Sequence, residues 1–390
     1  MVLEVRGRVA SLEKPGESHR ARLHDIVGHA FGLSADDVSR WFLRAGEEHV
    51  RALVRNSEVV GGLLEIPMGQ YFGGRSVSML GVAGVAIAAS ERGQGLGTKL
   101  MLETLRSARE RGFALSTLYA ASVTLYRRAG YERAGARFGF VLDPRHVEVA
   151  REPEMKMREV DTSSGLPDDM RALYNRFASK TPGFLDRGPY CWMRVVAPRG
   201  MTTKTFSVTR EGQLEGYVVL AHVMPPQGFP TSVHVTDMAA TTPRAARAIL
   251  RFLVEYRSLA EVVTWQGGPS ELFANMLPER HHTVKLSDYF LVRIIDVARA
   301  LEQRGYPAGT RRGLTFELDD ASLPEGSGRY DLGGGGSVVK VNERGLAALY
   351  SGMSQAHVLA DAGWLEADEE TQVLADAWFS GPLPTMRDHF

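Results

Sequence analysis

A short glycine-rich segment is the part of this sequence whose residue types point most directly to chemistry. It reads Arg92-Gly93-Gln94-Gly95-Leu96-Gly97, with Thr98 next, between an apolar run ending at Val85-Ala86-Ile87 and a helical pattern that continues to Arg111. Glycines just before a helix leave the backbone N–H groups at its positive end unobstructed, and such an end binds phosphate groups. The segment therefore predicts a phosphate site, best suited to a pyrophosphate.

The spacing of the glycines narrows the ligand. A Walker A loop requires Gly-Lys-Ser/Thr, whereas this sequence continues Gly97-Thr98-Lys99, and a dinucleotide-binding turn requires G-x-G-x-x-G. The pattern R-x-x-G-x-G after a strand instead resembles the loop that holds the coenzyme A pyrophosphate in the GNAT superfamily of acetyltransferases. The alternative is a glycine-rich turn that binds no ligand.

A tyrosine downstream supports the same interpretation. The segment Leu125-Tyr126-Arg127-Arg128-Ala129-Gly130-Tyr131 is similar to the Y-x-x-x-G-[FY] segment of GNAT enzymes. In those enzymes the first tyrosine lies beside the thioester sulfur and protonates the departing thiolate. A phenol with a pKa of about 10 is reasonably matched to a thiol with a pKa near about 8.5. From the residues alone, Tyr126 is equally well explained as a core side chain on a short helix.

Periodic patterns predict the elements that must position these residues. Apolar residues recur at helical spacing over residues 23–31 and again over 36–42, and extended runs cover 50–54 and 59–66 around a turn at 56–58. Further strands are predicted at 77–87 and 114–119, and a short helix at 123–129. An apolar strand pattern at 141–149 precedes the charged segment 151–154, which indicates a domain boundary near residue 150.

Two more blocks follow that boundary. The second has a helical stripe over 170–177, paired strands at 206–208 and 216–222, a strand at 233–238 and a helix at 245–259. Its order is similar to that of the first block, which predicts a second α/β layer of similar build. The third block begins near Tyr289 and has an alternating strand at 314–318, a turn at Gly333–Gly336, and helices at 298–304, 346–350 and 372–379.

Motifs beyond the first block resemble one family within the superfamily. Thr181-Pro182-Gly183-Phe184-Leu185-Asp186-Arg187, Trp265-Gln266-Gly267-Gly268-Pro269 and Leu277-Pro278-Glu279 are similar to segments of the enhanced intracellular survival (Eis) acetyltransferases, over essentially the whole chain. The resemblance implies an α/β (α+β) fold with tandem GNAT units. It implies a catalytic GNAT domain at 1–150, a GNAT-like domain without cofactor at 151–288, and a sterol carrier protein-like domain at 289–390.

The resemblance also assigns roles residue by residue. It implies that acetyl-CoA is the co-substrate and that Tyr126 is the acid. It further implies that the C-terminal residue, Phe390, enters the active site, where its α-carboxylate is the general base; a frayed tail is the alternative. The cofactor-binding residues that it implies are Val85, Ala86, Ile87, Arg92, Gly93, Gln94, Gly95, Leu96, Gly97, Thr98, Ala121 and Ser122. Many relatives have a proline near Ala89, so that residue receives no role.

Composition sets limits on partners and compartment. The 390 residues carry 46 basic and 46 acidic side chains, so no overall charge attracts nucleic acid or an anionic membrane. No apolar run approaches the roughly 20 residues that span a bilayer, and the first residues are too polar for a signal peptide. One cysteine, Cys191, excludes an internal disulfide and favours the cytoplasm. The histidines, His281 and His282 included, lack metal-ligand spacing, so no metal is expected.

The sequence does not identify which amine accepts the acetyl group. The resemblance implies direct acetyl transfer to a small-molecule primary amine, and aminoglycosides are a plausible class. Relatives that modify aminoglycosides hold the ammonium groups in an acidic cavity, to which Asp25, Asp36 and Asp37 could contribute here. Alternatives are a protein lysine or a polyamine as acceptor, or a lipid-binding protein with a non-catalytic GNAT scaffold. Relatives assemble as hexamers, so a homo-oligomer is expected.

Overall fold

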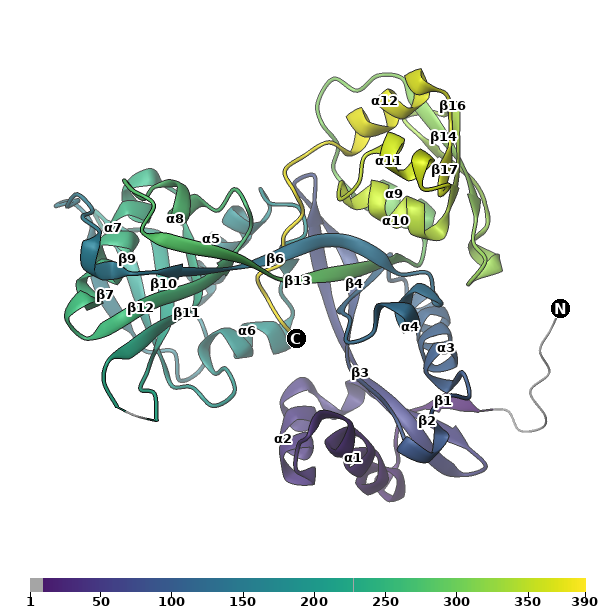
Figure 1. Cartoon of the computed structure of the whole chain (residues 1–390), viewed down its shortest axis with the longest axis horizontal. Helices are drawn as coiled ribbons and strands as arrows, with labels where there is room; N and C mark the ends of the chain where they lie inside the picture. The colour runs from purple at the N-terminus through teal and green to yellow at the C-terminus, as the bar shows by residue number, and fades with distance from the viewer. Residues whose placement is uncertain (1–9, 227) are drawn as a thin grey trace.

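The computed structural model describes residues 10–226 and 228–390, which form three lobes around one long sheet (Figure 1). The strand order of that sheet is β1-β2-β3-β4-β5-β13-β6-β12-β11-β10-β9-β7, with β8 paired to β3. A separate sheet has the order β15-β14-β16-β17. The first block of the sequence builds one end of the long sheet, and the second block builds the other.

The first lobe contains the elements predicted for the first block. Its helices are α1 (Glu17–Phe31), α2 (Ala35–Ala45), α3 (Leu96–Glu110) and α4 (Val123–Arg127). Its strands are β1 (Ser11–Glu13), β2 (Val50–Arg55), β3 (Glu58–Phe72), β4 (Arg75–Ile87), β5 (Leu115–Tyr119) and β6 (Glu132–Leu142). The predicted hairpin is confirmed: β2 and β3 pair around Asn56 and Ser57, which both adopt positive φ. The strand predicted at 141–149 is wrong, because β6 ends at Leu142 and Pro144 opens a 3₁₀ turn.

The second lobe is built in a similar way. Its strands are β7 (Lys156–Val160), β8 (Leu185–Asp186), β9 (Thr203–Arg210), β10 (Gln213–Val223), β11 (Thr231–Ala240) and β12 (Ala260–Gly267). Its helices are α5 (Asp168–Ala178), α6 (Pro189–Val196), α7 (Pro243–Val254) and α8 (Leu272–Asn275). The helix predicted at 245–259 begins earlier, because the Thr242 side chain caps it, and it ends earlier, in a 3₁₀ turn at Glu255–Ser258.

One strand joins these two lobes. β13 (His282–Ile294) follows the second lobe in sequence, but its last residues lie between β5 and β6 of the first lobe, with Phe290 opposite Tyr119. Its first residues continue along β6, where β12 pairs on the other side. Figure 1 shows β6 and β13 running together from one lobe to the other. The two lobes therefore share a continuous hydrogen-bonded sheet.

The third lobe packs above this junction. It contains α9 (Val297–Gln303), α10 (Glu343–Ser351), α11 (Ala356–Asp361), α12 (Glu369–Phe379), β14 (Gly313–Asp319), β15 (Gly328–Leu332), β16 (Gly336–Asn342) and β17 (Leu365–Glu366). The predicted glycine turn at 333–336 connects β15 and β16. After α12 the chain leaves this lobe and descends as an irregular tail into the space between the other two (Figure 1).

Candidate active site

The site forms where two parallel strands separate. β4 and β5 pair at Gly81 and Thr117, but no pairing between them continues, although β4 extends to Ile87 and β5 to Tyr119. The edge of β4 beyond Gly81 therefore presents backbone N–H and C=O groups to the gap. Such an edge can pair with an extended ligand in the way that it would pair with another strand.

A β-bulge shapes the edge of β4 at this gap. Gly62 pairs with Ala86 and Leu64 pairs with Ala83, so Gly84 and Val85 together oppose one residue of β3. Past the bulge, the N–H of Ala88 donates to the carbonyl of Val60 at 2.9 Å. Because N–H groups alternate between the two edges of a strand, the N–H of Ile87 points away from β3 and toward the gap.

The glycine-rich segment lies at the start of α3. Gly93 and Gly95 have φ angles of 79° and 75°, which glycine adopts without the penalty that a Cβ atom would bring. Gly95 is the N-cap of α3 and provides no side chain to bond the first N–H groups of the helix, which remain open to a ligand. Beside them, the Arg55 side chain forms an ion pair with Glu91 and donates to Gln94 Oε1 at 3.0 Å.

Tyr126 is buried on α4, with its ring in an edge-to-face contact with Tyr131 at 5.9 Å. The Tyr131 hydroxyl bonds to Ser116 Oγ at 2.7 Å, which fixes this aromatic pair against β5. Burial raises the pKa of Tyr126 to about 12, so its phenol keeps its proton at neutral pH. The side chain is thus held as a potential proton donor.

A cavity of about 790 Å³ lies in front of these groups. Its wall combines the bulged end of β4, the end of β5, α4, helices α2 and α6 of the two lobes, and the tail. Its volume is within the range of about 300–1,000 Å³ that small-molecule sites occupy. The predicted residues that line it are Val85, Ala121, Tyr126 and Phe390.

The other predicted residues lie outside this wall. Ala86 is buried in the core, and the segment Arg92–Thr98 lies at the N-terminus of α3, where Arg92 Nε donates to the Ile87 carbonyl at 3.3 Å. Ser122 is exposed just before α4. These residues adjoin the elements that form the cavity without facing into it. The structure therefore separates the predicted residues into a cavity group and a helix-terminus group.

The tail is docked along its backbone into the gap between the lobes. The N–H of Ala136 donates to the Pro384 carbonyl at 2.9 Å, and the N–H of Thr385 donates to the Pro182 carbonyl at 2.8 Å. The Tyr119 hydroxyl donates to the carbonyl of Met386 at 2.8 Å. Phe390 is buried, and a Cβ atom on Gly81 would lie 2.8 Å from its ring, so this ring packs where β4 and β5 begin to separate.

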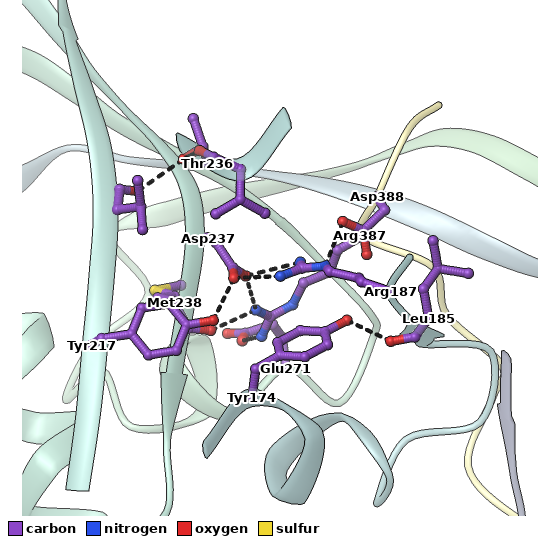
Figure 2. Close-up of polar contacts among 12 residues, drawn as sticks. Tyr174, Leu185, Arg187, Tyr217, Thr236, Asp237, Met238, Glu271, Arg387 and Asp388 are labelled. Carbon is purple, nitrogen blue, oxygen red and sulfur yellow. Dashed lines mark hydrogen bonds and ion pairs between the residues drawn. The ribbon is translucent and has the colours of Figure 1, made fainter. Parts of the chain in front are cut away.

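Buried charges of the second lobe hold the end of the tail, as Figure 2 shows. Arg187 forms a double ion pair with Asp237 at 2.6 and 3.1 Å, and its Nε atom donates to Asp388 at 2.9 Å. Burial opposes ionisation of Asp237, but the Arg187 guanidinium outweighs it and lowers the pKa of that carboxyl. Arg387 donates to the carbonyl of Met238 at 2.7 Å, and the Arg187 guanidinium lies 3.8 Å from the Tyr174 ring centroid.

Several residues of the site have no signal in the sequence. Tyr119 ends a strand, and its ring stacks on His389 at 5.0 Å with an interplanar angle of 15°. Trp41 on α2 donates through Nε1 to the Tyr190 hydroxyl on α6 at 2.8 Å, which closes the cavity between the lobes. These contacts join residues separated by 149 positions or more, so no local pattern indicates them.

Other candidates from the sequence lie elsewhere. Cys191 is buried beside the Met68 sulfur at 3.8 Å, and burial raises the pKa of its thiol. Of the predicted acidic residues, Asp37 lines the cavity, whereas Asp25 and Asp36 do not. In residues 10–226 and 228–390, no group of three or more His, Cys, Asp and Glu side chains could hold a metal ion. No helix in the described part of the chain has the length and apolar character needed to cross a membrane.

Comparisons with known proteins agree with this architecture. The acetyltransferase (GNAT) domain family matches residues 12–134, a second acetyltransferase (GNAT) domain family matches residues 183–294, and the sterol carrier protein domain family matches residues 297–387. A structure of a GCN5-related N-acetyltransferase from Anabaena variabilis is 28% identical, with a TM-score of 0.92 over 98% of this chain and 100% of that one. The structure of Eis1 from Mycobacterium abscessus, at 21% identity and a TM-score of 0.79, has the same fold over 98% of this chain.

Relatives in sequence extend over most of the chain. An N-acetyltransferase of Streptomyces avermitilis is 29% identical over 78% of this chain and 79% of its own length. N-acetyltransferase Eis of Mycobacterium tuberculosis is 25% identical over 85% of both chains. Two GNAT domains followed by a sterol carrier protein domain thus define an N-acetyltransferase enzyme of the GNAT superfamily, a class whose acetyl donor is acetyl-CoA. Within that superfamily, the chain belongs to the Eis family of N-acetyltransferases.

Proposed function

We propose that this enzyme transfers the acetyl group of acetyl-CoA directly to a small primary amine, with both substrates bound together. The observation that supports the proposal is the single cavity into which the bulged end of β4, Tyr126 and Phe390 all face. A thioester lying along β4 would reach the phenol, and an amine could approach from the side of α2 and α6. Direct acetyl transfer in a ternary complex requires that the thioester and the amine reach the same cavity at the same time.

In the proposed complex, acetyl-CoA binds along β4 and at the N-terminus of α3. The pyrophosphate of acetyl-CoA binds the open N–H groups after Gly95, with Arg92, Gly93, Gln94, Leu96, Gly97 and Thr98 forming the loop. The pantetheine arm pairs with the free edge of Val85, Ala86 and Ile87, and Ala121 and Ser122 contact the cofactor from beyond β5. The N–H of Ile87 polarises the thioester carbonyl, because it points into the gap.

The chemistry that we propose is one addition and one elimination. The neutral amine attacks the thioester carbon, a C–N bond forms, and the Ile87 N–H stabilises the oxyanion. The C–S bond then breaks, and Tyr126 donates its proton to the departing thiolate. Desolvation in the same cavity raises the pKa of both the phenol and the coenzyme A thiol, so the two pKa values remain close to each other. The α-carboxylate of Phe390 takes the proton that the amine loses.

The proposal also covers the domains and the assembly of the enzyme. Residues 1–150 form the catalytic domain, residues 151–288 a second GNAT domain without cofactor, and residues 289–390 a sterol carrier protein-like domain. A cytoplasmic homo-oligomer, a hexamer by analogy with relatives, remains the expected form. Sedimentation of the purified chain would test the assembly, and a mass near 42.8 kDa would contradict it.

A thiol-release assay with acetyl-CoA tests the central proposal. The acceptor panel contains aminoglycosides, polyamines and lysine peptides, which are the classes considered from the sequence, together with simple alkyl amines. We expect CoA release that depends on an added amine, with an acetylated amine found by mass spectrometry in equal amount. The control is the same reaction without an acceptor, which measures hydrolysis. Thiol release that no amine increases would contradict the proposed transfer.

A further inference from the structure

The outer part of the cavity is lined by arginines from both GNAT lobes. Arg40 and Arg44 lie on α2, Arg194 lies on α6, and Arg199 follows α6. The Arg40 and Arg199 side chains are 70% and 59% exposed, whereas Tyr126 and Phe390 are each 7% exposed. Arg40, Arg44 and Arg199 therefore lie at the mouth of the cavity, and the proposed reacting groups lie deep within it. Arg194 is half-buried and extends inward, close enough to act on His389.

These cations are only partly neutralised. Asp37 is the one acidic side chain on this part of the wall, and it lies 2.9 Å from Arg40 and 3.7 Å from Arg199. Arg194 donates to the neutral Tyr190 hydroxyl at 3.1 Å. Within residues 10–226 and 228–390, Arg44 and Arg194 take part in no ion pair with a carboxylate. Among the described residues, the mouth thus carries three positive side chains against one negative, and Arg194 adds a fourth cation further in.

The inner end carries charges of both signs. Asp288 lines the cavity there, near Tyr119 and His389, and Arg137 is its partner across β13 and β6. His389 adds no positive charge at neutral pH, because burial, together with Arg137 and Arg194, lowers its pKa to about 4. The wall also has apolar residues: Trp41 and Met193 are half-buried, whereas Phe31 and Leu43 are exposed and lie nearer the mouth. The cavity therefore has a cationic mouth, and at its inner end the Asp288 carboxylate is offset by Arg137 across β6 and β13.

The arginines lie across the sheet from the loop assigned to the cofactor phosphates. Helix α3 packs with Leu80 and Val82, whereas α1 and α2 pack with Met79 and Ala83, which alternate with them along β4. Successive side chains of a strand point to opposite faces. The mouth is therefore on the other face from Gly95, so its positive charge is available to a second ligand.

We infer that the acceptor is a primary amine that carries an anionic group, a carboxylate or a phosphate, at the other end of an apolar body. This inference rests on the proposed acetyl transfer and narrows its substrate class. The amine reaches the inner end beside Tyr126, the apolar body lies along Trp41 and Met193, and the anionic group meets the arginines, which are well suited to carboxylates and phosphates. A polycation such as an aminoglycoside or a polyamine would place its additional ammonium groups against this positive mouth.

Three amines of equal chain length provide the test: ε-aminohexanoate, hexylamine and hexanediamine, which differ at the far end by a negative, a neutral and a positive group. We expect kcat/KM for CoA release to be about tenfold higher with ε-aminohexanoate than with hexylamine, and lowest with the diamine, as one partly solvated ion pair would give. This preference should decrease as salt is added, because the mouth is exposed. An equal or reversed order would overturn the inference, although the proposed transfer would stand. Release with an aminoglycoside, polyamine or lysine peptide but with none of these three amines would overturn the inference alone. No release with these three or with any member of the wider acceptor panel would overturn both.

Variants connect the preference to the arginines. The double variant Arg44→Gln/Arg194→Gln should reduce the ratio of kcat/KM for ε-aminohexanoate over hexylamine to near one. Arg257→Gln, at an exposed arginine on the 3₁₀ turn after α7 that is not in the cavity wall, should preserve the ratio. A double variant that keeps the wild-type ratio, or that instead raises the KM for acetyl-CoA, would show that these arginines do not bind the acceptor.

Discussion

The Nε atom of Arg187 lies 2.9 Å from Oδ1 of Asp388, so a buried cation of the central lobe holds the tail two residues before Phe390. The other nitrogens of the same guanidinium hold Asp237, and both side chains of that pair are almost fully buried. The tail is thus attached to an ion pair that the lobe already contains. This attachment makes the central lobe, to which we assign no cofactor, a determinant of the geometry at the candidate active site.

Replacing Arg187 with methionine should destabilise the protein strongly. The substitution leaves Asp237 buried without its principal cation, and breaking one side of a buried pair costs about 3–5 kcal/mol. The free energy of unfolding, measured in urea, should decrease by that amount. A decrease below about 1 kcal/mol would mean that solvent reaches Asp237 and that the pair is not buried as described.

Asp388→Ala is the matched variant for the same cluster. It removes the contact with the tail but leaves the Arg187–Asp237 pair, so the stability should change little while turnover falls. A loss of stability equal to that of Arg187→Met would show that the tail is part of the core of this lobe and not a docked segment.

Adding one glycine after Phe390 should reduce turnover and leave acetyl-CoA affinity unchanged. The extension moves the carboxylate away from the buried ring at 390 and replaces it with a neutral amide. Loss of a general base typically lowers a rate by about 10²–10⁴-fold. Initial rates and the Kd of acetyl-CoA, measured on the same preparation, provide the test. Undiminished rates would contradict the role proposed for the Phe390 carboxylate.

Tyr126→Phe should lower kcat by about 10²-fold or more, with little change in the KM for acetyl-CoA, because it removes the proton donor and keeps the ring. Since burial raises the pKa of Tyr126 to about 12, ionisation of this phenol should not reduce the wild-type rate below pH 10. The comparison variant is Tyr131→Phe, whose hydroxyl bonds to Ser116 outside the cavity wall. If both variants retained the wild-type kcat, Tyr126 would not be the acid.

His389 should make the stability depend on pH between about 6.5 and 4. Burial, with Arg137 and Arg194, lowers its folded-state pKa to about 4 from an ordinary value of 6.5. The unfolded chain then binds a proton that the folded chain does not. The stabilisation is therefore complete above pH 6.5 and is lost as the pH falls toward 4.

The variant His389→Phe isolates this effect because it keeps a ring to stack on Tyr119 but cannot titrate. The decrease in unfolding free energy between pH 7.5 and 5 should be smaller in the variant than in the wild type. His24, His234 and His282 also have lowered pKa values, so part of the wild-type dependence should persist. An identical decrease in both proteins would mean that His389 is protonated as readily in the fold as in the unfolded chain.

The local elements of the site could be predicted because their signals are local. The glycines before α3, the hairpin around Asn56 and Ser57, and the strand ending at Ile87 all follow from neighbouring residues. Strand boundaries were less predictable, since the apolar pattern at 141–149 continues past Pro144, where hydrogen bonding ends. A periodic pattern reports which residues face a core, but not whether a partner strand is present.

The composition of the cavity could not be predicted, because it arises from contacts between distant segments. The sequence suggested an acidic acceptor site from Asp25, Asp36 and Asp37, yet only Asp37 lines the cavity, where two arginines adjoin it. Arg194 and Arg199 come from another lobe, and their proximity to α2 depends on how β6 and β13 join the two lobes. Charge counted along a sequence does not give the charge at a surface formed by folding.

The position of β13 between β5 and β6 has a consequence for synthesis on the ribosome. When translation has passed residue 150, the glycine loop and Tyr126 have been made, but the edges of β5 and β6 that flank the gap must wait for a strand about 130 residues downstream. Unpaired edges of this kind are sites of aggregation. The nascent first domain should therefore need chaperone protection until residue 294 emerges, and a fragment ending near 150 should be insoluble, although it carries most of the predicted cofactor-binding residues.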